Sequence, residues 1–142
     1  MSHHIFLDLV IKTSRQKVFD AFSQPVHLNN WWTLRSSGKP EMHAEYNLNF
    51  TDQYDWYCKV SAIKPNELIY FKMTRSDDDW NPTTFGIALK EHQDGTLLEF
   101  SHRDWQENNH HFRHSAYCWS LLLKNLKDYL ERGIIHPFET RN

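Results

Sequence analysis

The sequence contains few of the residues that cross-link or break up a chain, and no long apolar run. It has two cysteines, Cys58 and Cys118, four glycines and five prolines in 142 residues. Two cysteines are too few for a disulfide-stapled secreted domain, and so little glycine and proline excludes a collagen-like or low-complexity chain. A membrane span needs about 20 consecutive apolar residues, and Asp8 interrupts the apolar run near the N-terminus. We therefore expect a cytoplasmic protein without a signal peptide or a membrane contact.

The charges are balanced, and the composition is that of a folded protein. Lys and Arg total 16 against 18 Asp and Glu, which gives a net charge of −2 and a pI near 6.5. Nucleic-acid binding usually requires a strongly basic surface, so we expect no nucleic-acid partner. With 39% hydrophobic and 24% charged residues, residues 1–142 have the length and composition of a single soluble domain. The 15% aromatic share, with six tryptophans, is unusually high.

The N-terminal part of the chain predicts one strand followed by two short helices. Residues 3–12 alternate apolar and polar side chains with the period of a strand. Thr13 and Gln16 have the spacing of a capping box, which predicts that a helix begins there. Pro25 suits the first turn of a second helix, which we expect to run to about Trp31.

The middle of the chain predicts an antiparallel sheet. Residues 36–40, Ser-Ser-Gly-Lys-Pro, are the clearest loop in the sequence. After this loop, apolar and polar residues alternate in five segments: 44–50, 58–62, 68–74, 85–89 and 98–102. The connections between these segments are too short for crossover helices, so the strands should pair in sequence order as a meander.

The last predicted element is a long helix over residues 108–132, ended by Gly133 and Pro137. Six apolar residues recur along it at spacings of three and four and predict the buried face: Phe112, Ala116, Trp119, Leu123, Leu126 and Leu130. The fold class is therefore α+β, with a curved antiparallel sheet packed on this helix.

Two clusters and one cysteine could suggest metal or nucleophilic chemistry, but each has a simpler explanation. His110 and His114 lie opposite the predicted buried face of the helix, and a zinc site needs three or four ligands. Residues 77–79, three consecutive aspartates, lack the alternating ligands of a calcium loop. Cys58 lies on an apolar strand face, which is typical of a small core residue. We predict no metal site, no cofactor and no catalytic residue.

The predicted interior faces of the strands and the helix define a candidate ligand cavity. Alternation and helical spacing place most of its residues on these faces, and the candidate ligand-binding residues are Trp32, Phe71, Met73, Phe85, Phe100, His102 and Trp119. We expect Trp32 and His102 near the opening, where His102 would orient a hydroxyl or carboxylate of the ligand. The alternative is that His102 is a structural histidine bonded to the backbone.

Several short motifs together resemble a known superfamily. Val-Phe-Asp-Ala-Phe at 18–22 and the segment 28–32 resemble the opening of START-like (SRPBCC) domains with the helix-grip fold. Phe-Ser-His at 100–102, and Cys-Trp-Ser at 118–120 with the leucines that follow, are similar to the branch named after the activator of heat-shock protein 90 ATPase. The resemblance implies a sheet that grips a long helix, with a hydrophobic cavity between them. In the superfamily such cavities hold lipids, sterols, polyketides or hormones, and a minority of members are enzymes.

These observations favour the binding of a small hydrophobic molecule, lipid-like or aromatic, without catalysis. Two alternatives remain open: a protein-interaction module that regulates a chaperone ATPase, and an enzyme of the cyclase or hydrolase kind. Acid–base catalysis usually requires at least two converging titratable groups, and His102 is the one we place inside. Tyr117 and Leu121 lie on the outer face of the long helix and suggest weak homodimer formation.

Overall fold

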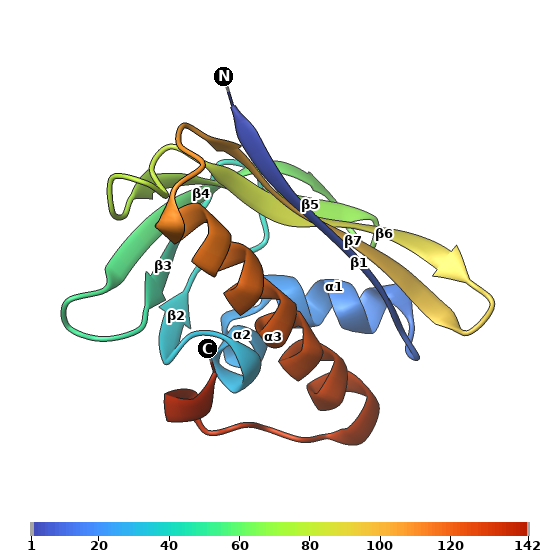
Figure 1. The fold of residues 1–142 in the computed structure, drawn as a ribbon. Helices are drawn as coiled ribbons and strands as arrows, with labels where there is room; N and C mark the ends of the chain where they lie inside the picture. Colours follow the sequence, from blue (N-terminus) through green and yellow to red (C-terminus); the bar gives the residue numbers. More distant parts are fainter. Residues whose placement is uncertain (1, 142) are drawn as a thin grey trace.

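The fold is a curved antiparallel sheet wrapped around a long C-terminal helix (Figure 1). It was obtained as a computed structural model that describes residues 2–141. The elements in chain order are β1 His3–Ile11, α1 Arg15–Ser23, α2 Pro25–Trp31, β2 Arg35–Ser37, β3 Glu45–Asn49, β4 Asp55–Lys64, β5 Leu68–Arg75, β6 Thr84–His92, β7 Gly95–Trp105, α3 His110–Arg132 and the 3₁₀ turn η1 Phe138–Thr140. The seven strands are ordered β1-β7-β6-β5-β4-β3-β2. The predicted α+β helix-grip fold is confirmed.

Side-chain caps mark the start of α1 and α3, whereas α2 begins at Pro25 without one. Helix α1 is capped by Ser14, whose hydroxyl accepts a hydrogen bond from the Lys17 backbone, so our prediction of Thr13 as the cap is wrong by one residue. Asn109 caps α3 by accepting from the Phe112 backbone. At its other end α3 stops at Gly133, whose φ of 67° is left-handed and suits glycine.

One short strand lies where the sequence predicted a loop. Strand β2, Arg35–Ser37, pairs with β3 along the edge of the sheet, with Ser36 opposite Leu48. Two of its three side chains are exposed, so the strand has no apolar alternation for a sequence pattern to detect. Its place at the sheet edge comes from backbone pairing with β3 instead.

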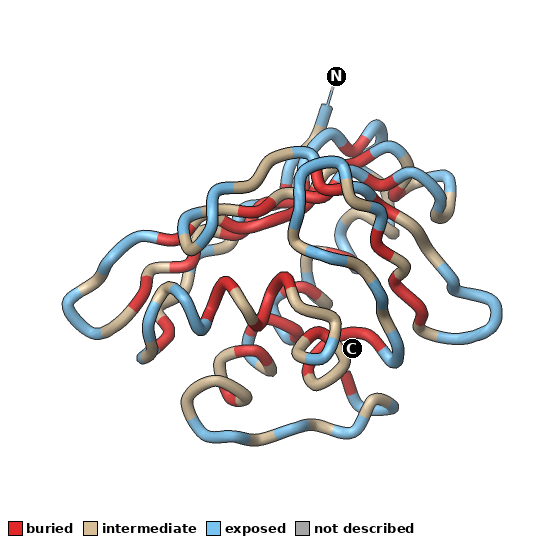
Figure 2. The backbone as a smooth tube through the Cα atoms, turned by 180° about the vertical axis from the view of Figure 1, so that it is seen from behind, coloured by how far each residue is buried: buried red, intermediate tan, exposed pale blue. Residues whose placement is uncertain are grey.

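Buried residues recur along the strands of the sheet and along the helices beneath it (Figure 2). The predicted helix face is confirmed at its centre, because Trp119, Leu123 and Leu126 are buried and the other three predicted residues are half-buried. Leu122 is also buried, since the stripe widens where α3 passes α2.

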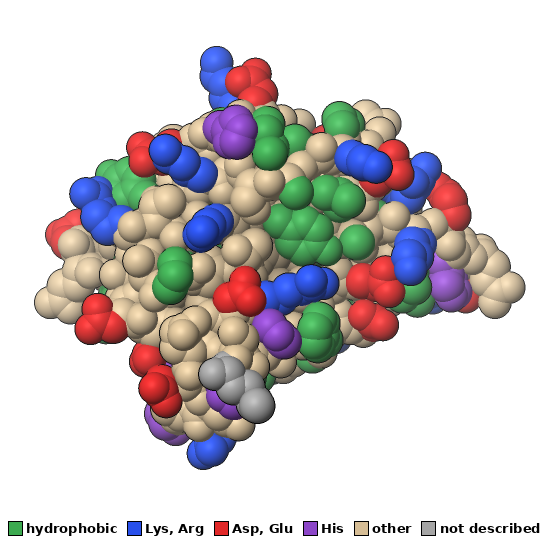
Figure 3. All heavy atoms as spheres, turned by 90° about the horizontal axis from the view of Figure 1, so that it is seen from above, with side chains coloured by type: hydrophobic (Ala, Val, Ile, Leu, Met, Phe, Trp, Pro, Cys, Tyr) green, Lys and Arg blue, Asp and Glu red, His purple; other side chains and the backbone are tan. Residues whose placement is uncertain are grey.

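The outer surfaces are mixed in character. Figure 3, which views the sheet from outside, shows acidic and basic side chains interspersed around smaller apolar areas. On α3, Tyr117 and Leu121 point outward and are exposed, as predicted. None of the described helices is long and apolar enough to cross a membrane.

We expect Trp119→Ala to lower the free energy of unfolding by about 3–5 kcal/mol, because the change leaves a large cavity in the core. Urea unfolding measures this loss. The matched control is Tyr117→Ala on the outer face of α3, which should cost less than about 0.5 kcal/mol. A loss below about 1 kcal/mol for Trp119→Ala would contradict the assigned packing.

Candidate functional site

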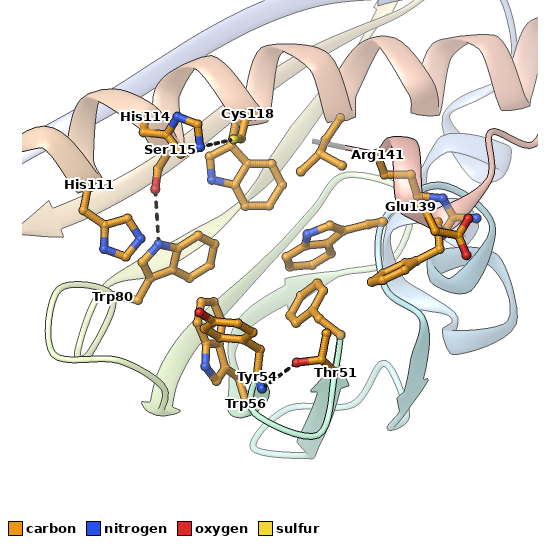
Figure 4. A pocket seen from close by; sticks show the side chains of 15 residues that line it. Thr51, Tyr54, Trp56, Trp80, His111, His114, Ser115, Cys118, Glu139 and Arg141 are labelled. Atoms are coloured by element: carbon orange, nitrogen blue, oxygen red, sulfur yellow. Dashed lines mark hydrogen bonds between the residues drawn. The ribbon is translucent and has the colours of Figure 1, made fainter.

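A pocket of about 500 Å³ opens beside the N-terminal half of α3 (Figure 4). Its walls come from α3, from the end of α2, from the β3–β4 and β5–β6 connections and from the C-terminal segment. Seven of the residues that line it are aromatic: Trp32, Phe50, Tyr54, Trp56, Trp80, Trp119 and Phe138. The pocket therefore has more aromatic wall than any other kind of surface.

Five of these aromatic side chains form a closed circuit of neighbouring rings, which we call the aromatic circuit. The distances between successive ring centroids are 5.0 Å for Trp32–Trp119, 6.0 Å for Trp119–Trp80, 4.9 Å for Trp80–Trp56, 5.6 Å for Trp56–Phe50 and 5.6 Å for Phe50–Trp32. All five distances lie within the range of favourable aromatic pairs. The circuit joins residues from five separate parts of the chain into one surface.

The polar lining residues lie at the two ends of the pocket. Figure 4 shows His111, His114, Ser115 and Cys118 at one end. The Cys118 sulfur lies 3.4 Å from His114 Nε2, and burial raises the pKa of the Cys118 thiol. A thiolate is the nucleophilic form of cysteine, and burial disfavours that form.

The other end of the pocket is formed by the segment that follows α3. Figure 4 shows Glu139 and Arg141 there. Arg141 is buried and donates hydrogen bonds to the carbonyl oxygens of His136, Asn29 and Thr33, at 2.8, 2.9 and 3.0 Å. The bonds to Asn29 and Thr33 fasten the C-terminal segment to the end of α2, and Figure 1 shows the segment returning beneath α3 to that place.

The structure brings two of the seven predicted cavity residues to this pocket, Trp32 and Trp119. The other five lie behind its wall in the packed core: Phe71, Met73, Phe85, Phe100 and His102. The Phe85 and Phe100 rings lie 5.7 and 4.5 Å from the Trp119 indole, so they support the pocket wall from the sheet side.

His102 is fully buried rather than at the opening. Trp119 Nε1 donates to His102 Nδ1 at 3.0 Å, and Nε2 lies 2.7 Å from the Thr83 hydroxyl. Since an indole N–H can only donate, Nδ1 must be unprotonated, and Nε2 carries the proton and donates to Thr83. The Thr83 hydroxyl in turn donates to the Trp80 carbonyl. Both ring nitrogens of His102 are thus occupied by hydrogen bonds within the protein.

Burial lowers the pKa of His102 to about 3, with a smaller contribution from nearby His111. The neutral form is therefore fixed at physiological pH, in agreement with the hydrogen-bond pattern. This histidine cannot serve as a general acid or base near pH 7.

The pocket residues that sequence reasoning missed come from the outer flank of α3, from the start of β4, from the connections and from the C-terminal segment. Trp80 directly follows the three aspartates at 77–79 in the β5–β6 loop, and its indole is buried and donates to the Ser115 hydroxyl at 3.3 Å. Asp79 of the same loop contacts His111 at 3.1 Å, which ties the loop to α3. The sequence signal that could have pointed to Trp80 was the position of the tryptophans near the ends of the predicted elements. Nothing in the sequence pattern indicated Arg141.

The described residues contain no group of three or more His, Cys, Asp or Glu side chains placed to hold a metal ion. His110 and His114 are exposed, with ring centroids 5.8 Å apart. Cys58 is fully buried, and its pKa is raised by burial.

Comparison with known proteins assigns the family. Residues 12–131 match the family described as activator of Hsp90 ATPase homolog 1-like protein. The chain belongs to this family. No curated protein matches the sequence.

Solved structures with the same fold include both a dimer and a protein from a biosynthetic locus. The Aha1 dimer from Colwellia psychrerythraea is 26% identical with a TM-score of 0.84, over 92% of this chain and 98% of that chain. Protein SSP2350 from Staphylococcus saprophyticus is 22% identical with a TM-score of 0.80, over 94% and 96%. DynU16, from the dynemicin biosynthetic locus, is 16% identical with a TM-score of 0.77, over 92% and 48%. The last two show similarity of fold alone.

The buried, neutral His102 predicts a pH-dependent stability. Its pKa is about 3 in the fold and about 6.5 in the unfolded chain, so between these values the unfolded state binds the extra proton. The free energy of unfolding should fall as the pH decreases from about 6.5 toward 3, by up to about 1.4 kcal/mol per pH unit from this group.

Urea unfolding between pH 7.5 and 4.5 tests this contribution. His102→Gln keeps one donor and one acceptor but cannot titrate, so its stability should depend less on pH than that of the wild type. The control His110→Gln, at an exposed position, should retain the wild-type slope. Equal slopes for the wild type and His102→Gln would contradict the assigned protonation.

Proposed function

We propose that the protein binds a small hydrophobic molecule in the pocket beside α3. The observation that carries this proposal is a preformed pocket of about 500 Å³ whose lining includes seven aromatic side chains. Ligand sites are typically concave, apolar and of this size, with few polar groups. The pocket lies toward Trp56, to one side of the sheet–helix interface in which the START-like resemblance implied a ligand, and it shares Trp32 and Trp119 with the predicted cavity.

Binding without catalysis fits the chemistry of the pocket. Burial raises the pKa of the Cys118 thiol, and His102 is neutral and fully hydrogen bonded behind the wall. A role in the cytoplasm, where the reduced Cys58 and Cys118 would persist, is part of the proposal. The likeness to DynU16 is one of fold and is compatible with a small-molecule ligand. No feature of residues 2–141 favours regulation of a chaperone ATPase over this function.

Filling the pocket with a larger side chain should weaken the binding of hydrophobic molecules. Cys118 lines the pocket from α3, so Cys118→Trp places a bulky indole in the ligand volume and should weaken binding of hydrophobic probes at least about tenfold, as steric exclusion removes the buried ligand area. Intrinsic tryptophan fluorescence and isothermal titration calorimetry measure the affinity. The matched control is Tyr117→Trp, one residue earlier on the outer face, which should bind like the wild type. Unchanged affinity for Cys118→Trp would place the ligand elsewhere.

We further propose weak self-association through the outer face of α3. Tyr117 is 60% and Leu121 37% exposed, and the Colwellia relative is described as a dimer. Two adjacent apolar side chains make a small surface, so the dimer would be weak.

Sedimentation equilibrium tests the dimer. The wild type should show a concentration-dependent increase in mass at high micromolar concentration, and Leu121→Glu should stay monomeric because it would bury a charge in the contact. Exposed Val26, on α2, provides the control variant Val26→Glu, which should associate like the wild type. A monomeric wild type throughout the range would refute the proposal.

A further inference from the structure

We propose that the pocket selects planar aromatic molecules over aliphatic lipids of similar size. This inference rests on the proposed function, because it names the class of ligand for the same site. It is carried by the aromatic circuit, Trp32, Phe50, Trp56, Trp80 and Trp119, which closes on itself through five ring contacts.

The walls of the pocket offer ring faces and edges rather than aliphatic groups. Leu122 is the one aliphatic hydrocarbon side chain among the residues that line it. Aromatic rings carry a quadrupole, so an aromatic ligand gains an interaction with each neighbouring ring beyond the burial of its area. An alkyl chain gains the area term alone.

Hydrogen bonds inside the protein fix the orientation of two of these indoles. Trp80 Nε1 donates to Ser115, and Trp119 Nε1 donates to His102. Both N–H groups are therefore satisfied without a ligand. What these two residues present to the pocket is their hydrocarbon ring surface, held in place before binding.

The cost of ordering the ligand also favours a rigid ring system. The wall is buried at Trp32, Trp80 and Trp119, which are 5%, 7% and 1% exposed, so the protein loses little freedom on binding. An alkyl chain loses rotational freedom at each of its bonds when it is held in a pocket, whereas a fused ring system has none of these rotations to lose. Preorganised walls thus discriminate by ligand stiffness as well as by ring contacts.

Two uncharged alcohols with ten carbons, 2-naphthol and 1-decanol, distinguish the contribution of ring contacts from that of buried apolar area. Decanol has the larger apolar surface, so burial of area alone predicts that decanol binds more tightly. Ring contacts predict the opposite order, with 2-naphthol bound at least about tenfold more tightly. Isothermal titration calorimetry on the whole protein measures both affinities.

A pair of neighbouring residues on β4 provides the variant and its control. Trp56 belongs to the aromatic circuit, whereas Tyr57 lies under the Arg75 guanidinium, 4.1 Å from it, and does not line the pocket. Trp56→Leu should reduce the preference for 2-naphthol several-fold while decanol still binds. Tyr57→Leu should leave the ratio of the two affinities as in the wild type.

The outcomes separate this inference from the proposed function. If neither alcohol binds the wild type, the proposed function itself fails. If both bind and decanol binds as tightly as 2-naphthol or more so, the pocket binds hydrophobic molecules but the selectivity for aromatic ligands is refuted. If Trp56→Leu and Tyr57→Leu lower the ratio equally, the aromatic circuit is not its source and the inference is again refuted.

Discussion

The hydrogen bond from the Trp119 indole to His102 joins the long helix to the sheet at the centre of the core. An indole can only donate, so this one contact requires a neutral histidine with its proton on the opposite nitrogen. That proton is directed at Thr83, whose hydroxyl reaches the Trp80 carbonyl. Helix α3, strand β7 and the β5–β6 loop are thereby held in one arrangement, because a change at any step would leave a buried polar group without a partner.

The same chain of hydrogen bonds determines the character of the pocket. Trp80 and Trp119 are at its two ends, and both line the pocket. The wall is therefore rigid where the sheet and the helix meet. The polar residues that could act on a ligand are instead at the ends of the pocket, where exposed side chains such as His114 and Glu139 can adjust.

Much of the fold could be predicted from periodicity. Alternation identified the faces of Tyr46, Phe71 and Phe100 because each strand packs one face on the helix. Strand β2 could not be predicted, since its pairing is a backbone property of a short edge strand. The cap of α1 was misplaced by one residue because Thr13 and Ser14 are both suitable caps, and the fold selects between them.

The location of the pocket was harder to predict than the residues of the interior. A period tells which face of an element is buried, but the volumes of all the packed side chains decide where space is left between them. Phe85 and Phe100 pack closely against Trp119, so the centre of the interface is filled and the space is displaced toward Trp56. Trp80 and Arg141 reach the pocket because a loop and the C-terminal segment fold against it. This folding leaves no periodic pattern in the sequence.

The C-terminal segment lies beyond the part of the chain that matches the family, which ends at residue 131. Phe138, Glu139 and Arg141 nevertheless form one end of the pocket, and Arg141 attaches the segment to its surroundings through its bonds to Asn29 and Thr33. Substitutions in this tail would therefore change the shape of one end of the pocket, while the packed centre between the sheet and α3 would keep its residues.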